Sequence, residues 1–164
     1  MHSGLRWIWI AVIVFIVDQL TKYAALNYLM DYEPLVITRF FNLTLAYNKG
    51  AAFSFLNQAS GWQLWFFGGL SLVVSIAILI WLKRLAYQQR WLNIALTFIV
   101  GGALGNLFDR ICYGHVIDFI QLHISHFYWP VFNIADSAIC IGAFMLVVDA
   151  FLKEKKGKSA NCQL

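Results

Sequence analysis

Two aspartates in apolar surroundings are the residues of this chain best suited to chemistry. Asp136 heads an apolar run that continues to about Leu152, and Asp118 lies between Ile117 and Phe119. An ionised carboxylate is costly in hydrocarbon, so such residues usually face a protein interior or a water-filled cavity and mark function. Two neighbouring carboxylates share a proton, so one can act as a base toward water and the other as an acid toward a carbonyl. The pattern predicts a membrane-embedded aspartyl hydrolase.

The composition is that of an integral membrane protein with the length of a single domain. Of the 164 residues, 61% are hydrophobic and only 12% are charged, about half the usual charged fraction of a soluble protein. The mean hydropathy is +0.68. The formal net charge of +4 does not indicate nucleic-acid binding, because no basic stripe is interleaved with aromatic residues. Three scattered cysteines, Cys112, Cys140 and Cys162, resemble neither a disulfide framework nor a metal-binding spacing.

Four apolar segments are long enough to cross a bilayer, which requires about 20 helical residues each. They run approximately over residues 5–26, 62–82, 91–108 and 131–152. All seven tryptophans lie at or near a predicted boundary, as in an aromatic belt. The first segment could instead be a cleaved signal peptide, but Asp18 and Lys22 stand where a small-residue cleavage site belongs. We interpret it as a retained span.

The basic residues predict the orientation of these spans. Eight lie on the side of the two termini and four on the other side, which places both termini in the cytoplasm. The stretches 31–61 and 111–130 are then extracytoplasmic. Residues 31–61 contain runs of β-branched and aromatic residues, which favour a small β platform on the membrane surface. Such a platform could present an extended peptide to the two aspartates by strand addition. The predicted fold class is therefore all-α transmembrane with a small extracytoplasmic sheet.

Further polar residues could support the aspartates or contact a substrate. Asn48 on the platform could hydrogen-bond a peptide backbone, and Gly50 would permit close approach, although ordinary turn chemistry explains both equally well. Asn106, Asp109 and Arg110 stand at i, i+3 and i+4, so they share one helix face at the outer end of the third span. A structural hydrogen-bond network and direct substrate contact remain open for these three.

Two more positions follow from helical spacing. Asn133 precedes Asp136 by about one turn and could orient it. Asp18 and Lys22 are four residues apart and can form an ion pair on one face of the first span, which reduces the cost of burying either charge. We interpret this pair as structural.

Other kinds of site fit the sequence less well than an aspartyl hydrolase. His115, His123 and His126 form a conceivable zinc set, but three loop histidines are usually surface residues, and no His-Glu-x-x-His motif exists. No G-x-S-x-G elbow supports a serine hydrolase. The rival from another class is a small proton-coupled carrier in which Asp18, Asp118 and Asp136 relay protons. A relay needs acids at several depths, whereas a catalytic pair needs two at one depth. A non-catalytic assembly factor of the membrane is the third reading.

Five motifs, in order and spread over essentially the whole chain, carry a resemblance to a known family. They are Asp18-Gln19-x-Thr21-Lys22, Asn48-x-Gly50-Ala51-Ala52-Phe53, Gly101-Gly102-Ala103-Leu104-Gly105-Asn106-Leu107-Phe108-Asp109-Arg110, Gly114-x-Val116-x-Asp118-Phe119 and Phe132-Asn133-Ile134-Ala135-Asp136-Ser137. Together they resemble the bacterial lipoprotein signal peptidases, also called signal peptidase II. Any one motif would be weak evidence, whereas the five together are highly specific.

The resemblance implies a detailed function. Asp118 and Asp136 would be the catalytic dyad, and the other motif residues, Ala135 among them, would support the site. The implied substrate is a prolipoprotein that carries diacylglycerol on its lipobox cysteine, cleaved just before that cysteine. The enzyme would use water, without cofactor or metal, and the cyclic peptide globomycin would occupy the site. We expect a monomer in contact with membrane lipid, in the inner membrane of a bacterium, with its site near the outer face.

Overall fold

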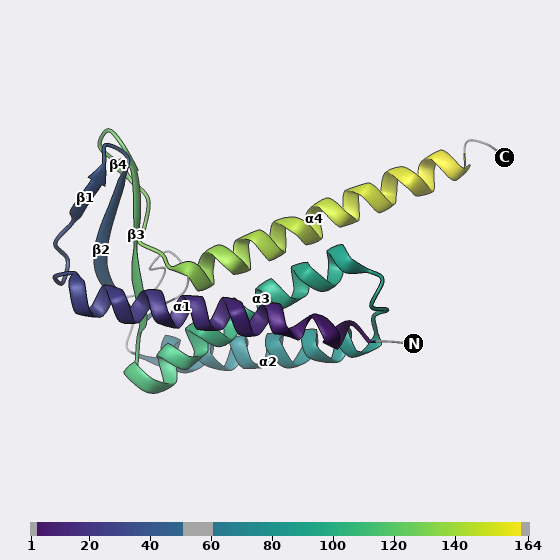
Figure 1. The fold of residues 1–164 in the computed structure, drawn as a ribbon, viewed down its shortest axis with the longest axis horizontal. Helices are drawn as coiled ribbons and strands as arrows, with labels where there is room; N and C mark the ends of the chain where they lie inside the picture. Colours follow the sequence, from purple (N-terminus) through teal and green to yellow (C-terminus); the bar gives the residue numbers. More distant parts are fainter. Residues whose placement is uncertain (1–2, 51–60, 162–164) are drawn as a thin grey trace.

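The computed structural model describes residues 3–50 and 61–161, with side chains through residue 153. Part of the predicted platform, residues 51–60, lies outside the described residues, and so do the motif residues Ala51, Ala52 and Phe53. The elements in chain order are η1 (Gly4–Trp7), α1 (Ile8–Tyr28), β1 (Leu35–Thr38), β2 (Phe41–Asn48), α2 (Trp62–Arg84), α3 (Arg90–Tyr113), β3 (Val116–Ile124), β4 (Phe127–Tyr128) and α4 (Ile134–Asn161) (Figure 1).

Among the described residues, four helices are long and apolar enough to cross a membrane, and together with the small sheet they confirm the predicted combination of spans and sheet. Large apolar side chains such as Trp65, Val73 and Phe144 are exposed on these helices, as contact with lipid requires. Two helix ends differ from the sequence prediction. Helix α3 continues to Tyr113, where Gly114 adopts a left-handed conformation with φ 73°, and α4 begins only at Ile134.

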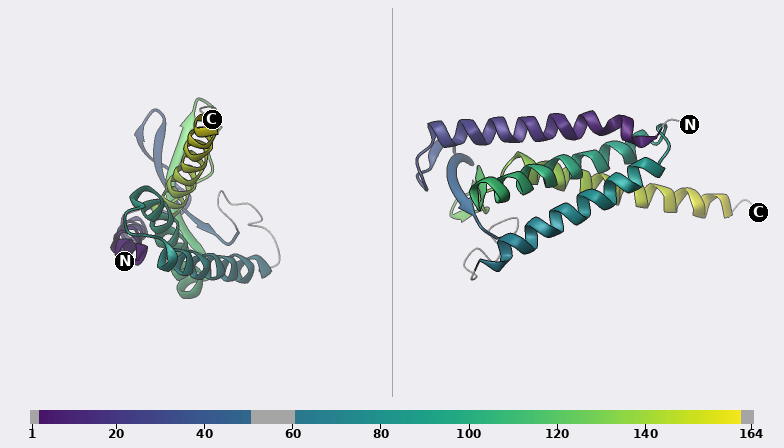
Figure 2. Two further views of the ribbon diagram at one scale, coloured as in Figure 1. Left: turned by 90° about the vertical axis from the view of Figure 1, so that its right-hand side faces the viewer. Right: turned by 90° about the horizontal axis from the view of Figure 1, so that it is seen from below.

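Helix α3 is the centre of the bundle, with α1, α2 and α4 packed around it (Figure 2). Small residues on α3 allow this close packing. A Cβ at Gly102 would overlap the carbonyl oxygen of Ala135, and a Cβ at Gly105 would lie 2.6 Å from Asp18 Oδ2. The glycines therefore bring the acidic face of α1 and the first turn of α4 together against α3.

The four strands form one antiparallel sheet in the order β1-β2-β3-β4, at the end of the bundle opposite the described ends of η1 and α4 (Figure 1). In the register of β2 and β3, Ala46 pairs with Asp118 and Asn48 pairs with Val116. A cluster of Ala25, Leu45, Ile117 and Phe119 packs the sheet against the end of α1. The sheet therefore holds Asp118 over the ends of the helices.

The segment before α4 is tied to the same sheet. Phe132 forms a bridge with Ile120, with its amide donating to the Ile120 carbonyl at 3.0 Å and its own carbonyl accepting from the Ile120 amide at 2.8 Å. Residues 131–133 were predicted to belong to the fourth span, and they instead precede the helix as extended chain. This pairing fixes where α4 starts relative to β3.

Candidate active site

The two predicted catalytic acids come from different elements and meet around one asparagine. Asp118 lies on β3 and is fully buried, and Asp136 lies in the first turn of α4 with 6% of its surface exposed. Asn133 Nδ2 donates to Asp118 Oδ1 at 2.7 Å, and Asn133 Oδ1 accepts from the backbone amide of Asp136 at 2.8 Å. One side chain therefore holds both acids, and Asn133 also caps the N-terminus of α4.

The sheet and α3 each supply a further amide donor. Asn48 on β2 donates through Nδ2 to Asp118 Oδ2 at 3.0 Å, and Asn106 on α3 donates through Nδ2 to Asp136 Oδ1 at 2.8 Å. Both side chains are buried, with 3% and 6% exposed. The predicted support residues Asn48 and Asn106 thus touch one acid each.

Arg110 and Gly50 connect α3 with the end of β2. The Arg110 guanidinium donates to the Gly50 carbonyl at 2.9 Å and to the Asn106 carbonyl at 3.2 Å, and it lies 5.9 Å from the centre of the Phe67 ring. The Gly50 amide donates to Asn48 Oδ1 at 2.9 Å, so the same turn also orients Asn48. Of the two roles left open for Arg110, the structure displays the hydrogen-bond network.

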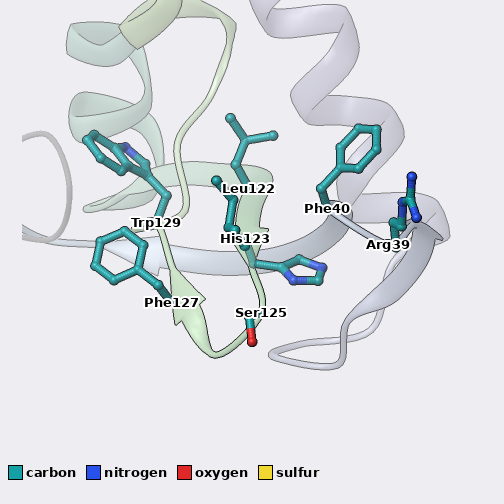
Figure 3. A pocket seen from close by; sticks show the side chains of 8 residues that line it. Arg39, Phe40, Leu122, His123, Ser125, Phe127 and Trp129 are labelled. Atoms are coloured by element: carbon teal, nitrogen blue, oxygen red, sulfur yellow. The ribbon is translucent and has the colours of Figure 1, made fainter.

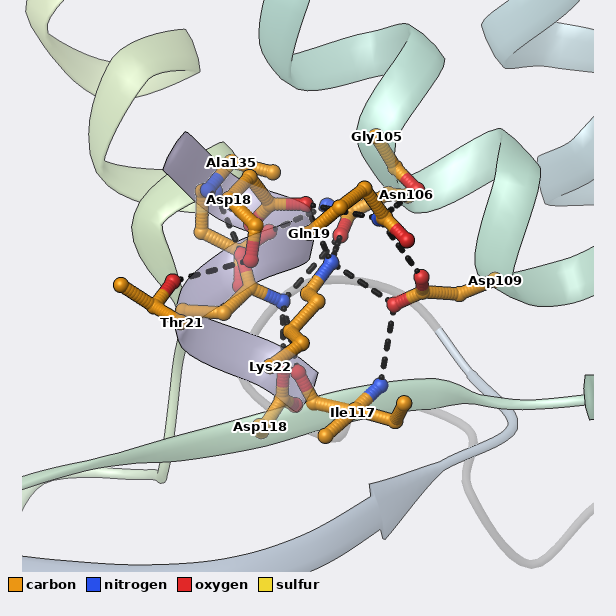
Figure 4. A network of polar contacts seen from close by, with 12 residues as sticks. Asp18, Gln19, Thr21, Lys22, Gly105, Asn106, Asp109, Ile117, Asp118 and Ala135 are labelled. Atoms are coloured by element: carbon orange, nitrogen blue, oxygen red, sulfur yellow. Dashed lines mark hydrogen bonds and ion pairs between the residues drawn. The ribbon is translucent and has the colours of Figure 1, made fainter. Parts of the chain in front are cut away.

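A second buried cluster lies beside the dyad and is centred on Lys22 (Figure 4). The Lys22 ammonium is 2.8 Å from Asp18 Oδ2 and 2.7 Å from Asp109 Oδ2, and it donates to Asn106 Oδ1 at 3.0 Å. The predicted ion pair with Asp18 is present. The pair is part of a three-charge cluster, because Asp109 turns toward α1 and not toward its sequence neighbour Arg110.

The cluster also fixes the start of α4 and of β3. Asp18 Oδ1 accepts from the Ala135 amide at 2.8 Å, so two side chains, Asp18 and Asn133, satisfy backbone amides in the first turn of α4. Asp109 Oδ2 accepts from the Ile117 amide at 3.2 Å, one residue before Asp118. The role of Ala135 in this arrangement is its backbone amide.

Gln19 is a site residue to which the sequence assigned no role. Its Nε2 donates to Asp109 Oδ1 at 2.9 Å, to Asp18 Oδ2 at 3.1 Å and to the Gly105 carbonyl at 3.3 Å. Its place within the first motif, beside Asp18, was the only available signal. Its contact with Asp109 on α3 could not be predicted from the sequence of one helix.

Burial and charge together set the protonation of Asp118. Loss of solvation on burial, and next the negative charge of Asp136, raise the pKa of Asp118 from 3.8 to about 8, although the amides of Asn48 and Asn133 oppose the shift. The two acids together are therefore expected to hold one proton at neutral pH. A protonated acid beside a second carboxylate can donate to a carbonyl oxygen while its neighbour accepts a proton from water.

The zinc site considered as an alternative finds no support in the described part of the chain. No group of three or more His, Cys, Asp or Glu side chains is placed to hold a metal ion there. His123 stacks on Tyr128 at the β3–β4 hairpin, whereas His115 contacts Tyr47 at 4.6 Å between ring centres. Burial lowers the pKa of His115, which favours its neutral form.

An apolar pocket of about 710 Å³ lies at the far end of the sheet and does not include the dyad. Phe40, Leu122, Phe127 and Trp129 line it, with Arg39 and His123 as its basic members (Figure 3). Its lining contains none of the side chains that hydrogen-bond to Asp118 or Asp136.

A four-helix membrane protein that buries two linked acids under a small sheet fits the class of membrane-embedded acid–base hydrolases. Comparison with known proteins identifies the member of this class. The model of the family described as signal peptidase (SPase) II matches residues 10–152. The chain belongs to the signal peptidase II family.

Individual relatives agree over nearly the full length. Proteins named lipoprotein signal peptidase are 53% identical in Pseudoalteromonas atlantica, with 92% of each chain covered, and 51% identical in Pseudomonas aeruginosa, with 96% of this chain and 94% of the relative covered. A solved structure described as a bacterial membrane enzyme superposes with a TM-score of 0.82 at 35% identity, covering 96% of both chains.

Proposed function

We propose that this protein is a membrane aspartyl endopeptidase that removes signal peptides from prolipoproteins, with Asp118 and Asp136 as its catalytic dyad. The main observation behind this proposal is that both acids are buried and linked through Asn133. Each carboxylate also accepts a hydrogen bond from a further amide side chain, Asn48 for Asp118 and Asn106 for Asp136. Membership in the signal peptidase II family supports the peptidase activity.

The reaction follows from the two unequal acids. Asp136, ionised, accepts a proton from water as the water oxygen attacks the scissile carbonyl carbon. Asp118, protonated, donates to the carbonyl oxygen, which stabilises the tetrahedral intermediate. Breakdown of the intermediate breaks the C–N bond. The leaving amine takes the proton that Asp136 accepted, and one hydroxyl of the intermediate returns its proton to Asp118 as the new carboxylic acid forms and then ionises. The products are a new carboxylate on the signal peptide and the free amine of the cleaved protein.

The substrate is the one that membership in the signal peptidase II family implies. We propose a prolipoprotein whose lipobox cysteine carries diacylglycerol, cleaved just before that cysteine. Its acyl chains would lie in lipid against the apolar helices while the scissile bond reaches the dyad. Globomycin would compete for the same space, and the enzyme would act as a monomer without cofactor. The proposed location is the bacterial inner membrane, with the sheet outside and both termini in the cytoplasm.

The arrangement of the acids favours this function over proton-coupled transport. A relay requires acids at successive depths. Asp18, Asp118 and Asp136 instead contact the residues around one helix N-terminus, because Asp18 accepts from Ala135 and Asn133 holds the other two.

The direct test uses purified enzyme and a diacylglyceryl-modified precursor, with and without globomycin. We expect Asp118→Asn and Asp136→Asn each to lower the cleavage rate by at least about a thousandfold while leaving membrane insertion intact. Asp149→Asn is the matched control, since Asp149 lies far along α4 and pairs with the exposed Lys153 at 2.6 Å. Cleavage at the wild-type rate by either dyad variant would remove that residue from the mechanism.

A further inference from the structure

Lys22 makes one contact more than it needs to neutralise Asp18 and Asp109. Besides Asp18 and Asp109, its ammonium donates to Asn106 Oδ1 at 3.0 Å, and only 1% of Lys22 is exposed. An ammonium group has donors and no acceptor. The oxygen of the Asn106 amide, and not its nitrogen, must therefore face Lys22.

This contact determines what Asn106 presents on its other side. The same Oδ1 also accepts from Asn133 Nδ2 at 3.1 Å, and Asn106 Nδ2 donates to Asp136 Oδ1 at 2.8 Å. A reversed amide would place its NH₂ group against two donors and its oxygen against a carboxylate. Buried polar groups left without partners are costly, so a single orientation of Asn106 is strongly preferred.

We propose that Lys22 is a positioning residue of the cleavage reaction, acting through Asn106. By holding the Asn106 oxygen, Lys22 keeps the amide donor on Asp136, so that this carboxylate remains ionised and oriented to accept the proton from water. The inference rests on the proposed function and adds a role that charge neutralisation alone does not give. Lys22 and Asn106 touch neither water nor substrate in this role.

Other charges act on Asp136 from every side and must be separated from this effect. Asp118 on β3 and Asp18 on α1 are acids, whereas Lys22 on α1 and Arg110 on α3 are cations. Lys22 is held closely by Asp18 and Asp109, which offset much of its charge. The hydrogen bond from Asn106 is therefore the more direct route from Lys22 to Asp136.

A double-mutant cycle tests the route, using Lys22→Met, Asn106→Leu and the combined variant on the diacylglyceryl-modified precursor. Removing one hydrogen bond to a charged group should move the acid limb of the kcat/KM profile up by about one pH unit in each single variant. On that limb the rate falls about tenfold, with KM little changed. The combined variant should shift no further than Asn106→Leu, because the two residues act in series. Lys153→Met is the control that should leave the profile unchanged.

Either of two results would overturn the inference: an unmoved acid limb in Lys22→Met, or a combined variant whose shift is the sum of both. A purely structural Lys22 would lower the amount of folded enzyme without moving the limb. If Lys22→Met yields no folded protein, Lys22→Met with Asp109→Asn removes one of the stranded carboxylates, and Asp109→Asn alone is its reference. The acid limb of this double variant is then expected to lie about one pH unit above that of Asp109→Asn. Failure of the wild-type enzyme to cleave the precursor would instead contradict the proposed function.

Discussion

Among the described residues, the side chains that donate hydrogen bonds to the carboxylates of Asp118 and Asp136 are all amides. Asn48, Asn106 and Asn133 donate to Asp118 or Asp136, while the cations Lys22 and Arg110 are bound to other acceptors. A cation in direct contact would favour ionisation of both acids. Amides satisfy the carboxylate oxygens and favour ionisation less than a cation would, so the pair can keep the proton that the proposed reaction requires.

The protonation of Asp118 predicts a loss of activity in alkali. Its pKa of about 8 means that the proton donor is lost as the pH rises through that value. We expect kcat/KM to be flat near neutrality and to fall about tenfold per pH unit above about pH 8. A profile measured from about pH 5 to about pH 10 would contradict this assignment if it showed no alkaline limb.

The same shift predicts how stability depends on pH. The native state keeps the Asp118 proton up to about pH 8, whereas the unfolded chain releases it near 3.8. Asp118 therefore lowers the free energy of unfolding progressively as the pH rises from about 4 to about 8, with no further loss above it. Thermal unfolding in detergent should show this slope, and Asp118→Asn should reduce it.

Removing the Lys22 ammonium should destabilise the fold strongly. Lys22→Met leaves Asp18 and Asp109 buried and without their cation, which costs about 3–5 kcal/mol for a broken buried pair. The melting temperature should fall by roughly 10 °C or more. Lys153→Met breaks an ion pair of similar length whose lysine is 64% exposed, and it should change stability by less than about 1 kcal/mol. Equal effects of the two variants would refute the structural role of Lys22.

At the level of elements, the site depends on how closely three helices approach one another. Helix α3 contributes Asn106, Asp109 and Arg110, α1 contributes Asp18 and Lys22, and α4 begins at the dyad. Glycine at position 102 allows the Ala135 carbonyl to contact the α3 backbone, which sets the height of the first turn of α4. Asp136 is therefore positioned by backbone packing as well as by its hydrogen bonds.

Gly102→Ala should separate α4 from α3 and move Asp136. The added methyl group overlaps the Ala135 carbonyl, so we expect a loss of about 1–3 kcal/mol and at least about a tenfold loss of cleavage. Gly69→Ala is the matched control, since a Cβ at Gly69 meets nothing within 4 Å. That variant should retain activity and gain helix stability by up to about 1 kcal/mol. Wild-type cleavage by Gly102→Ala would show that α4 adjusts without disturbing the dyad.

For the whole molecule, the sheet and the connection between α2 and α3 lie at opposite ends of the bundle (Figure 1). Lys83, Arg84 and Arg90 flank that connection, and this charge predicts a cytoplasmic location. The dyad, beneath the sheet, would then face the outer side of the membrane, where translocated prolipoproteins arrive.

Cysteine labelling checks this orientation. In a variant without native cysteines, Ser125→Cys on the β3–β4 turn should react with a membrane-impermeant maleimide added outside spheroplasts. Gln88→Cys between α2 and α3 should react only after permeabilisation. Both positions are exposed, so reactivity reports the side of the membrane. The reverse labelling pattern would overturn the proposed topology.

The sequence alone predicted the four long apolar helices, the burial of Asp118 and Asp136 near each other, and the contact between Asp18 and Lys22. Long apolar runs, acids in hydrocarbon and i, i+4 spacing each have a local physical cause. The ends of α3 and α4 were misplaced because they depend on Gly114 adopting positive φ and on the Asn133 cap. A hydropathy pattern does not record such contacts.

Only the tertiary structure decided which polar groups meet. The ion pair of Lys22 with Asp109, the place of Gln19 and the joint hold of Asn133 on both acids all join elements distant in sequence. Such contacts depend on the separation and rotation of helices, which glycine packing on α3 and the pairing of β3 with the segment before α4 determine. The sequence indicates which acids are unusual because burying charge is costly anywhere in a membrane. The partners of these acids follow from three-dimensional packing.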